Sequence, residues 1–178
     1  GKEQKWQICT TNLKEMYALY RKRRLRQEII DLVPARPELE FPEARKMKRK
    51  FILHIGPTNS GKTYNALERL KTAENGVYLG PLRLLALEVY ERMTDAGILC
   101  TMLTGQECIE TSGSRITAST VEMLDIEKEY DIAVIDEAQL VADDDRGHSW
   151  TRAILGTKAK EIHVCMSPCL LYTSDAAD

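Results

Sequence analysis

An apolar run that ends in a glycine-rich loop is the feature that most restricts what this chain can fold into. Residues 51–55 read as a short strand and run directly into Gly56-Pro57-Thr58-Asn59-Ser60-Gly61-Lys62-Thr63. Gly56 and Gly61 permit a close backbone approach that a Cβ would obstruct, so successive N–H groups can converge on phosphate oxygens. We therefore predict a nucleotide site, in which Lys62 neutralises the β and γ phosphates and the Thr63 hydroxyl ligates Mg²⁺.

A second apolar run, residues 132–135, ends in Asp136-Glu137-Ala138-Gln139, 74 residues beyond Lys62. In an open α/β sheet, acids at the carboxyl end of a strand lie at the same edge as the phosphate loop. We expect Asp136 to hold the metal ion, and Glu137 to orient and deprotonate the water that attacks the γ phosphorus. Gln139 is expected to report the nucleotide state to neighbouring loops. The alternative is an ordinary strand end with solvated acids.

Strand-like runs alternate with helical stretches from residue 51 onward. This order predicts an α/β fold, a P-loop domain whose mainly parallel sheet has right-handed crossovers. Strands are expected at residues 51–55, 77–79, 98–103, 115–118, 132–135 and 161–165, and helices over 62–70 and 82–94. Trp150 and Ile154 have helical spacing and should lie in the core. His54 and His163 should be packed or edge residues, and His148 has no catalytic partners.

Charge divides the chain unevenly. The first 50 residues hold 14 Lys+Arg against 7 Asp+Glu, a net charge of +7, whereas the remainder has a net charge of −9. Apolar residues at helical spacing over 13–32, ended by Pro34 and Pro37, predict an amphipathic helix that contains the densest basic cluster, Arg21, Lys22, Arg23, Arg24 and Arg26. Such an arm favours a polyanion as partner, and the alternative is a solvated helix face.

Composition limits the compartment and the partners. No window approaches about 18 uninterrupted apolar residues, so we expect no membrane partner. The five cysteines are odd in number and form no Cys-x-x-Cys pair, which fits reduced thiols better than disulfides or a zinc site. A cytoplasmic location in a bacterial-type source is the favoured expectation. The mitochondrial matrix is the alternative, because Gly1 in place of Met suggests that the true N-terminus lies upstream, where a targeting segment could have been.

The segments between the two motifs distinguish between reactions. Thymidine kinases also have a phosphate loop followed by a strand that ends in Asp-Glu-Ala-Gln, so a nucleoside kinase is an alternative on these motifs alone. Residues 80–86, 103–107 and 118–123 read GPLRLLA, LTGQE and ASTVEM. They resemble, in order, motifs Ia, Ib and the following RNA-contacting motif of superfamily 2 helicases. With RGHSWTRAILG at 146–156, the chain resembles the Suv3 family of ATP-dependent RNA helicases over about residues 51–165.

The resemblance implies a RecA-like domain that hydrolyses ATP with Mg²⁺ and moves along RNA, with DNA as an alternative. It implies that five residues lie near the nucleic-acid backbone: Pro81, Arg83, Thr104, Gly105 and Thr120. Each also has a simpler role open to it. Pro81 and Gly105 can shape turns, Arg83 can be a surface charge, and the two threonines can cap helices. These residues do not indicate whether a nuclease is a partner.

We expect three parts, namely a basic helical extension and linker (1–50), a RecA-like ATP-binding domain (51–168) and a tail (169–178). The tail matches nothing in the family and resembles translated sequencing-adapter sequence, which suggests an artificial truncation. Family members continue into a second RecA-like domain that supplies an arginine finger. Loss of such a finger typically lowers the rate about 10³- to 10⁵-fold, so this chain alone should turn over very slowly. A nucleotide- or RNA-binding module without turnover is the remaining alternative.

Overall fold

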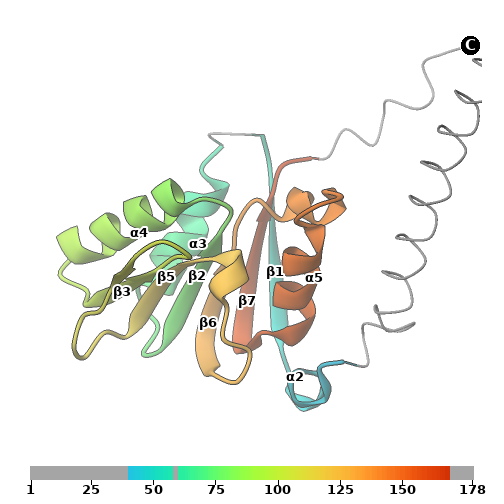
Figure 1. The fold of residues 1–178 in the computed structure, drawn as a ribbon, viewed down its shortest axis with the longest axis horizontal. Helices are drawn as coiled ribbons and strands as arrows, with labels where there is room; N and C mark the ends of the chain where they lie inside the picture. The colour runs from blue at the N-terminus through green and yellow to red at the C-terminus, as the bar shows by residue number, and fades with distance from the viewer. Residues whose placement is uncertain (1–39, 58–59, 169–178) are drawn as a thin grey trace, which may run out of the picture. The chain divides into compact units, whose positions relative to one another are not determined.

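The computed structural model describes residues 40–57 and 60–168 (Figure 1). The predictions for the basic arm, for Thr58 and Asn59 of the phosphate loop and for the tail fall outside these residues. The elements in chain order are α2 (Pro42–Lys46), β1 (Lys50–Ile55), α3 (Lys62–Leu70), β2 (Gly76–Gly80), α4 (Arg83–Asp95), β3 (Cys100–Leu103), β4 (Cys108–Ile109), β5 (Ile116–Thr120), η2 (Val121–Met123), β6 (Glu129–Ile135), η3 (Ala138–Ala142), α5 (Gly147–Gly156) and β7 (Lys158–Met166).

The seven strands form one sheet in the order β1-β7-β6-β2-β5-β3-β4. Every neighbouring pair is parallel except β3 and β4, which run antiparallel. The predicted α/β fold with a mainly parallel sheet is therefore confirmed. Within the described residues, no helix is both long enough and apolar enough to cross a membrane.

Helices cover both faces of the sheet, and the side-chain alternation of the strands builds a core on each. Ile132 and Val134 of β6 face α3 and α4, where they join a cluster with Leu70 and Met93. Ala133 and Ile135 face the other way and pack with Trp150 and Ala153 of α5. Figure 1 shows α3 and α4 on one side of the sheet and α5 on the other. Because β6 is covered on both faces, its sequence reads as a continuous apolar run.

Strand ends differ from the prediction where backbone pairing continues past the apolar residues. β6 begins at Glu129, three residues before the predicted start, because Glu129 pairs with Lys158 of β7 although both side chains are polar. β4 was not predicted, since two residues give no readable alternation. β3 begins at Cys100, two residues after the predicted start, just beyond a turn in which Gly97 has a φ of +74°.

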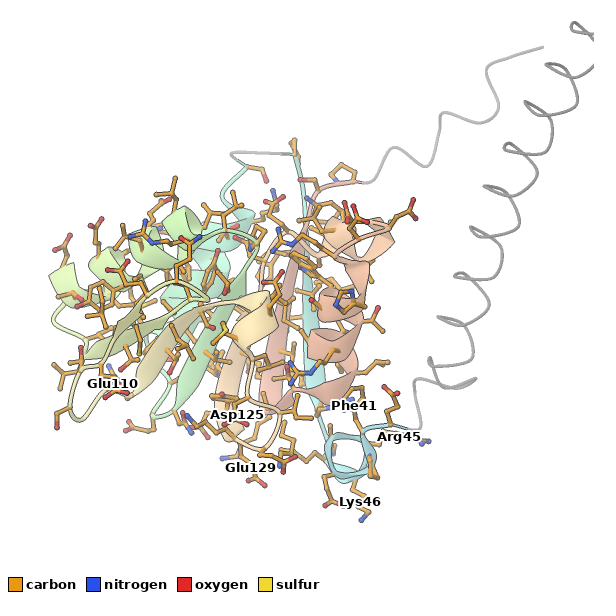
Figure 2. The ribbon with its side chains drawn as sticks, viewed as in Figure 1. Phe41, Arg45, Lys46, Glu110, Asp125 and Glu129 are labelled. Atoms are coloured by element: carbon orange, nitrogen blue, oxygen red, sulfur yellow. The ribbon has the colours of Figure 1, made fainter. Side chains whose placement is uncertain are left out.

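The amino edge of the sheet carries charged residues and the short helix α2. Figure 2 shows Asp125 and Glu129 at this edge, and Arg45 and Lys46 on α2. The Phe41 ring lies against the end of α5, where a Cβ on Gly156 would come within 2.8 Å of it. This edge is opposite the carboxyl ends of the strands, where the candidate site residues are found.

Candidate nucleotide and nucleic-acid site

The phosphate loop and the strand-end acids lie at the same edge of the sheet, separated by one strand. Ile55, the last residue of β1, pairs with Met166 of β7, and Ile135, the last residue of β6, pairs with Val164 of β7. The Gly56 N–H donates to the Met166 carbonyl at 3.2 Å, which extends the β1–β7 pairing into the loop. The order β1-β7-β6 therefore aligns the two motifs at the carboxyl edge, as the sequence predicts.

Gly61 has the conformation that the loop-to-helix junction requires. Its φ is +81°, in the left-handed region, and it immediately precedes α3. A Cβ there would meet no atom within 4 Å, so the requirement for glycine is conformational rather than one of space. At Gly56 the constraint is different, because a Cβ would lie 2.5 Å from Ser60 Oγ, a side-chain atom that can rotate away.

The Lys62 side chain folds back across its own loop. The residue is 8% exposed, and its Nζ donates to the Pro57 carbonyl at 3.2 Å. A buried ammonium is costly unless it is paired, and here one neutral carbonyl is its hydrogen-bond acceptor. Phosphate oxygens at this position would be stronger acceptors for the charged amine.

Asp136 is the centre of a buried hydrogen-bond network. It is 4% exposed. The Thr63 hydroxyl donates to Asp136 Oδ1 at 3.1 Å, and the Glu137 N–H donates to the same oxygen at 2.9 Å. Burial raises the pKa of the Asp136 carboxyl, and the hydrogen bonds it accepts oppose that rise. The structure thus brings Thr63 and Asp136, the two predicted metal ligands, into direct contact.

Tyr78 is a site residue that the sequence reasoning missed. Its hydroxyl donates to Asp136 Oδ2 at 2.9 Å from within β2, where the ring is buried. Burial and then the charge of Asp136 raise the pKa of Tyr78, so the hydroxyl stays protonated and acts as a donor. A Cβ on Gly80 would lie 2.7 Å from the Tyr78 ring and hydroxyl, so glycine at 80 leaves room for this contact. A polar-tipped aromatic residue inside a buried strand was the available signal.

Glu137 has a strained backbone. Its φ is +50° and its ψ is +43°, and it is the one non-glycine residue with positive φ in the described part of the chain. Such a conformation costs about 1–3 kcal/mol and persists only where the surroundings impose it. Gln139 Nε2 donates to the Glu137 carboxylate, and Gln139 Oε1 accepts from the Ser167 N–H at 3.1 Å. Gln139 therefore connects Glu137 to the segment that follows β7.

These groups line one pocket of about 440 Å³. Its lining includes the predicted residues Lys62, Thr63, Asp136 and Glu137, together with Glu88 and Arg92 of α4. Arg92 also lies over the Tyr64 ring, 4.8 Å from its centroid. The pocket thus joins the phosphate loop to the strand-end acids, and its lining includes two cations, Lys62 and Arg92, that could pair with phosphate.

The five candidate nucleic-acid residues lie at the carboxyl ends of β2, β5 and β3, which are consecutive in the sheet. Pro81 and Arg83 follow β2, Thr104 and Gly105 follow β3, and Thr120 ends β5. These positions are on the same edge as the pocket, and together they form a row beside it.

The side chains in this row differ in how they are engaged. Arg83 is exposed, and its Nε donates to Glu107 Oε2 at 3.0 Å. Thr104 is buried, and its hydroxyl donates to the Glu107 carbonyl at 3.0 Å and accepts from the Glu107 N–H at 3.0 Å. The Thr104 hydroxyl therefore stabilises its own turn, a role similar to the helix capping predicted from the sequence as the alternative to phosphate binding. Gly105 is exposed, with no atom within 4 Å of an added Cβ.

The histidines and Trp150 have structural partners. His54 Nε2 and His163 Nδ1 are 2.7 Å apart across β1 and β7, and His163 Nε2 lies 2.6 Å from Glu161 Oε1. His148 is exposed, with Ser149 Oγ at 3.5 Å. Trp150 is fully buried, as predicted, and its Nε1 donates to the Asp136 carbonyl at 2.9 Å.

Comparison with known proteins identifies relatives over most of the chain. It is 52% identical over 136 residues to the mitochondrial DExH-box ATP-dependent RNA helicase DExH18 of Arabidopsis thaliana, covering 76% of this chain and 18% of the relative. It is 52% identical over 130 residues to the mitochondrial ATP-dependent RNA helicase SUV3 of Saccharomyces cerevisiae, covering 70% of this chain and 18% of the relative. The chain thus spans about a fifth of the length of these relatives.

A solved structure is also similar, and the names of the relatives bear on the predicted location. A solved structure of Arterivirus nonstructural protein 10 (helicase) with DNA is similar at a TM-score of 0.48 and 14% identity, covering 68% of this chain and 31% of that one. The prediction that favoured a cytoplasmic over a mitochondrial location is wrong, because the curated relatives from plants, yeasts and fish are named as mitochondrial proteins.

The family assignment rests on the match over residues 37–173 to the description "DEXQ-box helicase domain of Suv3". This span includes the phosphate loop, Asp136 to Gln139 and the row of strand-end residues beside them. It confirms the resemblance drawn from the motifs and leaves the thymidine kinase alternative without support. Because the match covers well over half of the chain, this protein belongs to the Suv3 family of helicases.

Proposed function

We propose that this chain is the first ATP-binding motor domain of an ATP-dependent RNA helicase. One observation carries the proposal: a single pocket joins Lys62 and Thr63 to Asp136 and Glu137, beside a row of candidate phosphate contacts on the same sheet edge. In a motor of this class the nucleotide state must alter the grip on a strand, and two sites on one sheet edge are close enough to be coupled. The names of the relatives support RNA as the substrate.

The proposed ATP site consists of the phosphate loop and the strand-end acids. Residues 56–63 bind the phosphates through backbone N–H groups and the Lys62 ammonium. The donor set suits magnesium, since the Thr63 hydroxyl and an Asp136 carboxylate oxygen are both hard oxygen donors 3.1 Å apart. Thr63 and Asp136 would hold the ion, which would supply positive charge to the phosphates and to the leaving group.

Hydrolysis in this proposal depends on Glu137. Its carboxylate orients the attacking water and accepts its proton, while Lys62 stabilises the charge on the transferred phosphoryl group. The Gln139 amide holds the carboxylate from one side and contacts Ser167 from the other. A change at Glu137 on hydrolysis therefore has a direct route to the segment after β7.

The nucleic-acid site is proposed to grip the sugar–phosphate backbone without reading sequence. Arg83 supplies charge at the Pro81 loop, and Gly105 and Thr120 supply backbone and hydroxyl contacts. Thr104 contributes by holding the turn that presents Gly105. The basic arm within residues 1–50 is proposed as a further RNA contact, with 51–168 as the motor domain and 169–178 as a tail outside it.

The whole protein is proposed to act in mitochondria, because its relatives are named as mitochondrial proteins. It is also proposed to combine this domain with a second RecA-like domain that supplies an arginine finger. A nuclease is a candidate partner for such an RNA motor.

The test is ATP hydrolysis by the whole protein with and without single-stranded RNA. Turnover should rise with RNA and fall to background in Glu137→Gln, which keeps nucleotide binding but removes the proton acceptor. Glu110→Gln is the matched control, because Glu110 is exposed and does not line the pocket. Turnover that is indifferent to polynucleotide would contradict the helicase assignment.

A further inference from the structure

Arg146 lies in a turn whose backbone is tightly determined. The Asp143 Oδ1 atom accepts the N–H groups of Asp145 and Arg146 at 3.0 and 2.8 Å, and the Gly147 N–H donates to the Asp143 carbonyl at 2.9 Å. A Cβ on Gly147 would lie 2.3 Å from the Val141 carbonyl oxygen, so glycine alone fits there. The Arg146 side chain therefore starts from a well-defined point at the beginning of α5.

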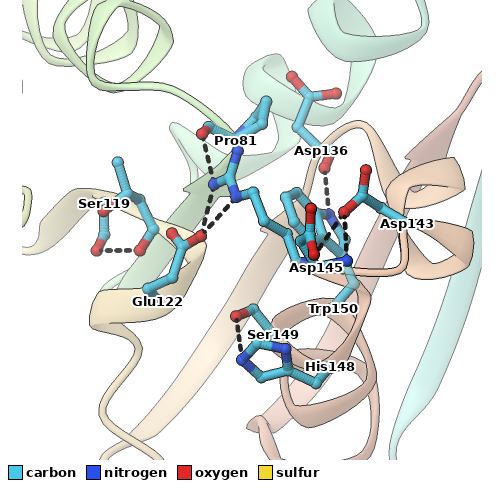
Figure 3. A network of polar contacts seen from close by, with 11 residues as sticks. Pro81, Ser119, Glu122, Asp136, Asp143, Asp145, His148, Ser149 and Trp150 are labelled. Carbon is cyan, nitrogen blue, oxygen red and sulfur yellow. Dashed lines mark hydrogen bonds and ion pairs between the residues drawn. The ribbon is translucent and has the colours of Figure 1, made fainter. Parts of the chain in front are cut away.

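The Arg146 guanidinium joins two loops that are distant in sequence. Its Nη2 donates to the Pro81 carbonyl at 2.7 Å, and its Nε donates to Glu122 Oε1 at 2.9 Å. The guanidinium carbon also lies 5.2 Å from the centroid of the Trp150 ring. Figure 3 shows these contacts converging between the loop after β2 and the turn after β5.

The same network reaches the nucleotide pocket. Trp150, against which Arg146 packs, donates from Nε1 to the Asp136 carbonyl at 2.9 Å. One continuous path of contacts therefore runs from the Asp136 peptide through Trp150 and Arg146 to Pro81 and Glu122. Pro81 is a candidate nucleic-acid residue, and Glu122 is two residues from another, Thr120.

The chemistry of this contact suits positioning better than direct binding of phosphate. Glu122 already neutralises the Arg146 charge, and both side chains are about 40% exposed, at 38% and 41%. A pair as exposed as this adds little to folding stability. What it does supply is geometry, because a planar guanidinium can hold two acceptors on different loops at fixed directions, whereas an ammonium acts as a point charge.

We infer that Arg146 is a positioning residue for the nucleic-acid grip. It sets the spacing between the Pro81 loop and the Thr120–Glu122 turn, and through Trp150 it fastens both to the peptide of Asp136. The inference rests on the proposed function, since it assigns the row of strand-end residues to RNA.

The test compares Arg146→Lys with Arg152→Lys in the 178-residue chain. Arg152 is the matched control, because it lies on α5, which Arg146 directly precedes, and it donates to the Leu124 carbonyl at 3.0 Å rather than to Pro81 or Glu122. Affinity for fluorescein-labelled single-stranded RNA is measured at several low salt concentrations, alongside affinity for a fluorescent ATP analogue. Urea unfolding identifies the conditions in which every variant is folded.

Positioning predicts that Arg146→Lys weakens RNA binding at least five-fold, with ATP-analogue affinity within two-fold and the salt slope unchanged. Arg152→Lys should stay within two-fold for both ligands. A loss of folding stability alone would not change RNA affinity under conditions where the variant is folded. If Arg146 instead contacted phosphate directly, lysine would replace it with little loss, and a change to alanine would reduce the salt slope by about one.

Glu122→Gln is a second, independent variant at an exposed position. Positioning predicts weaker RNA binding, although a negative charge has been removed from the surface. Tighter binding by Glu122→Gln, or equal RNA affinity of Arg146→Lys and Arg152→Lys, overturns the inference while leaving the proposed function in place. A wild-type chain that binds the ATP analogue but no RNA would refute the nucleic-acid part of the proposed function itself, and the inference with it.

Discussion

Replacing Tyr78 with phenylalanine removes one hydroxyl from the centre of the candidate site. The Tyr78 hydroxyl and Asp136 Oδ2 are 2.9 Å apart, the ring is 1% exposed, and Asp136 is 4% exposed. Water has little access to replace the lost donor, so the carboxylate oxygen is left with an unmet hydrogen bond. A hydrogen bond to a charged group contributes about 1.5–3 kcal/mol, and we expect Tyr78→Phe to lower the free energy of unfolding by about 2 kcal/mol.

Nucleotide binding should weaken as well, because Asp136 loses the contact that orients it toward Thr63. A loss of about 1.4 kcal/mol corresponds to a ten-fold weaker affinity, which is the expected order for an ATP analogue with magnesium. In the absence of magnesium the two proteins should differ less. Urea unfolding at pH 7 and fluorescence titration of the analogue measure the two effects separately.

Tyr130→Phe is the control for the loss of a tyrosine hydroxyl from a largely buried strand. Tyr130 is 7% exposed on β6, and in the described residues its hydroxyl has no hydrogen bond to a carboxylate. Its replacement should change stability by less than about 0.5 kcal/mol, as expected away from a buried polar contact. If Tyr78→Phe changes stability no more than Tyr130→Phe, the Tyr78–Asp136 hydrogen bond does not hold the site together.

Two other measurements test contacts away from the pocket. Arg69 and His163 hold the pKa of Glu161 at about 2, well below its ordinary value of 4.5, so the Glu161 carboxylate stabilises the fold above pH 4.5 and that contribution is lost as the pH falls toward 2. Glu161→Gln should therefore lower the free energy of unfolding by about 2 kcal/mol at pH 7, and the half-exposed position of Arg69 limits the effect to this size. The difference between the two proteins in urea unfolding should shrink below pH 4.5. A difference that does not change with pH would contradict the ion pair. Exchanging Arg23 and Arg24 for glutamate should weaken RNA binding and flatten its salt dependence, and an unchanged slope would assign the basic arm to a solvated face.

The phosphate loop and the strand-end acids were predictable because their signals are local. Three consecutive residues carry the signal. Gly61 indicates a backbone conformation that favours glycine, Lys62 indicates a charge for the phosphates, and Thr63 indicates a hydroxyl ligand for magnesium. The structure gives Gly61 a left-handed conformation, which glycine adopts without strain. Likewise, the apolar run that ends at Ile135 predicts both a buried strand and the edge at which Asp136 emerges.

Tyr78 and Arg146 were not predictable in the same way. The Tyr78 hydroxyl meets a carboxylate 58 positions later, and Arg146 meets a carbonyl 65 positions earlier. No spacing rule relates such residues, since their contact depends on the strand order and on the path of the loops. Thr104 is the converse case, because a hydroxyl that the family resemblance offers to phosphate is engaged within its own turn.

The amino-acid sequence by itself determined the α/β class, the nucleotide motif, the paired acids and the family. Each of these depends on residue type and spacing along the chain, and a motif keeps its meaning wherever the domain lies. Only the tertiary structure decided that β7 separates the loop from the acids, that the Tyr78 hydroxyl donates to Asp136, and that Arg146 joins two loops beside the pocket. The reason is physical: hydrogen bonds and burial act over a few ångströms, and folding alone determines which distant residues come within that range.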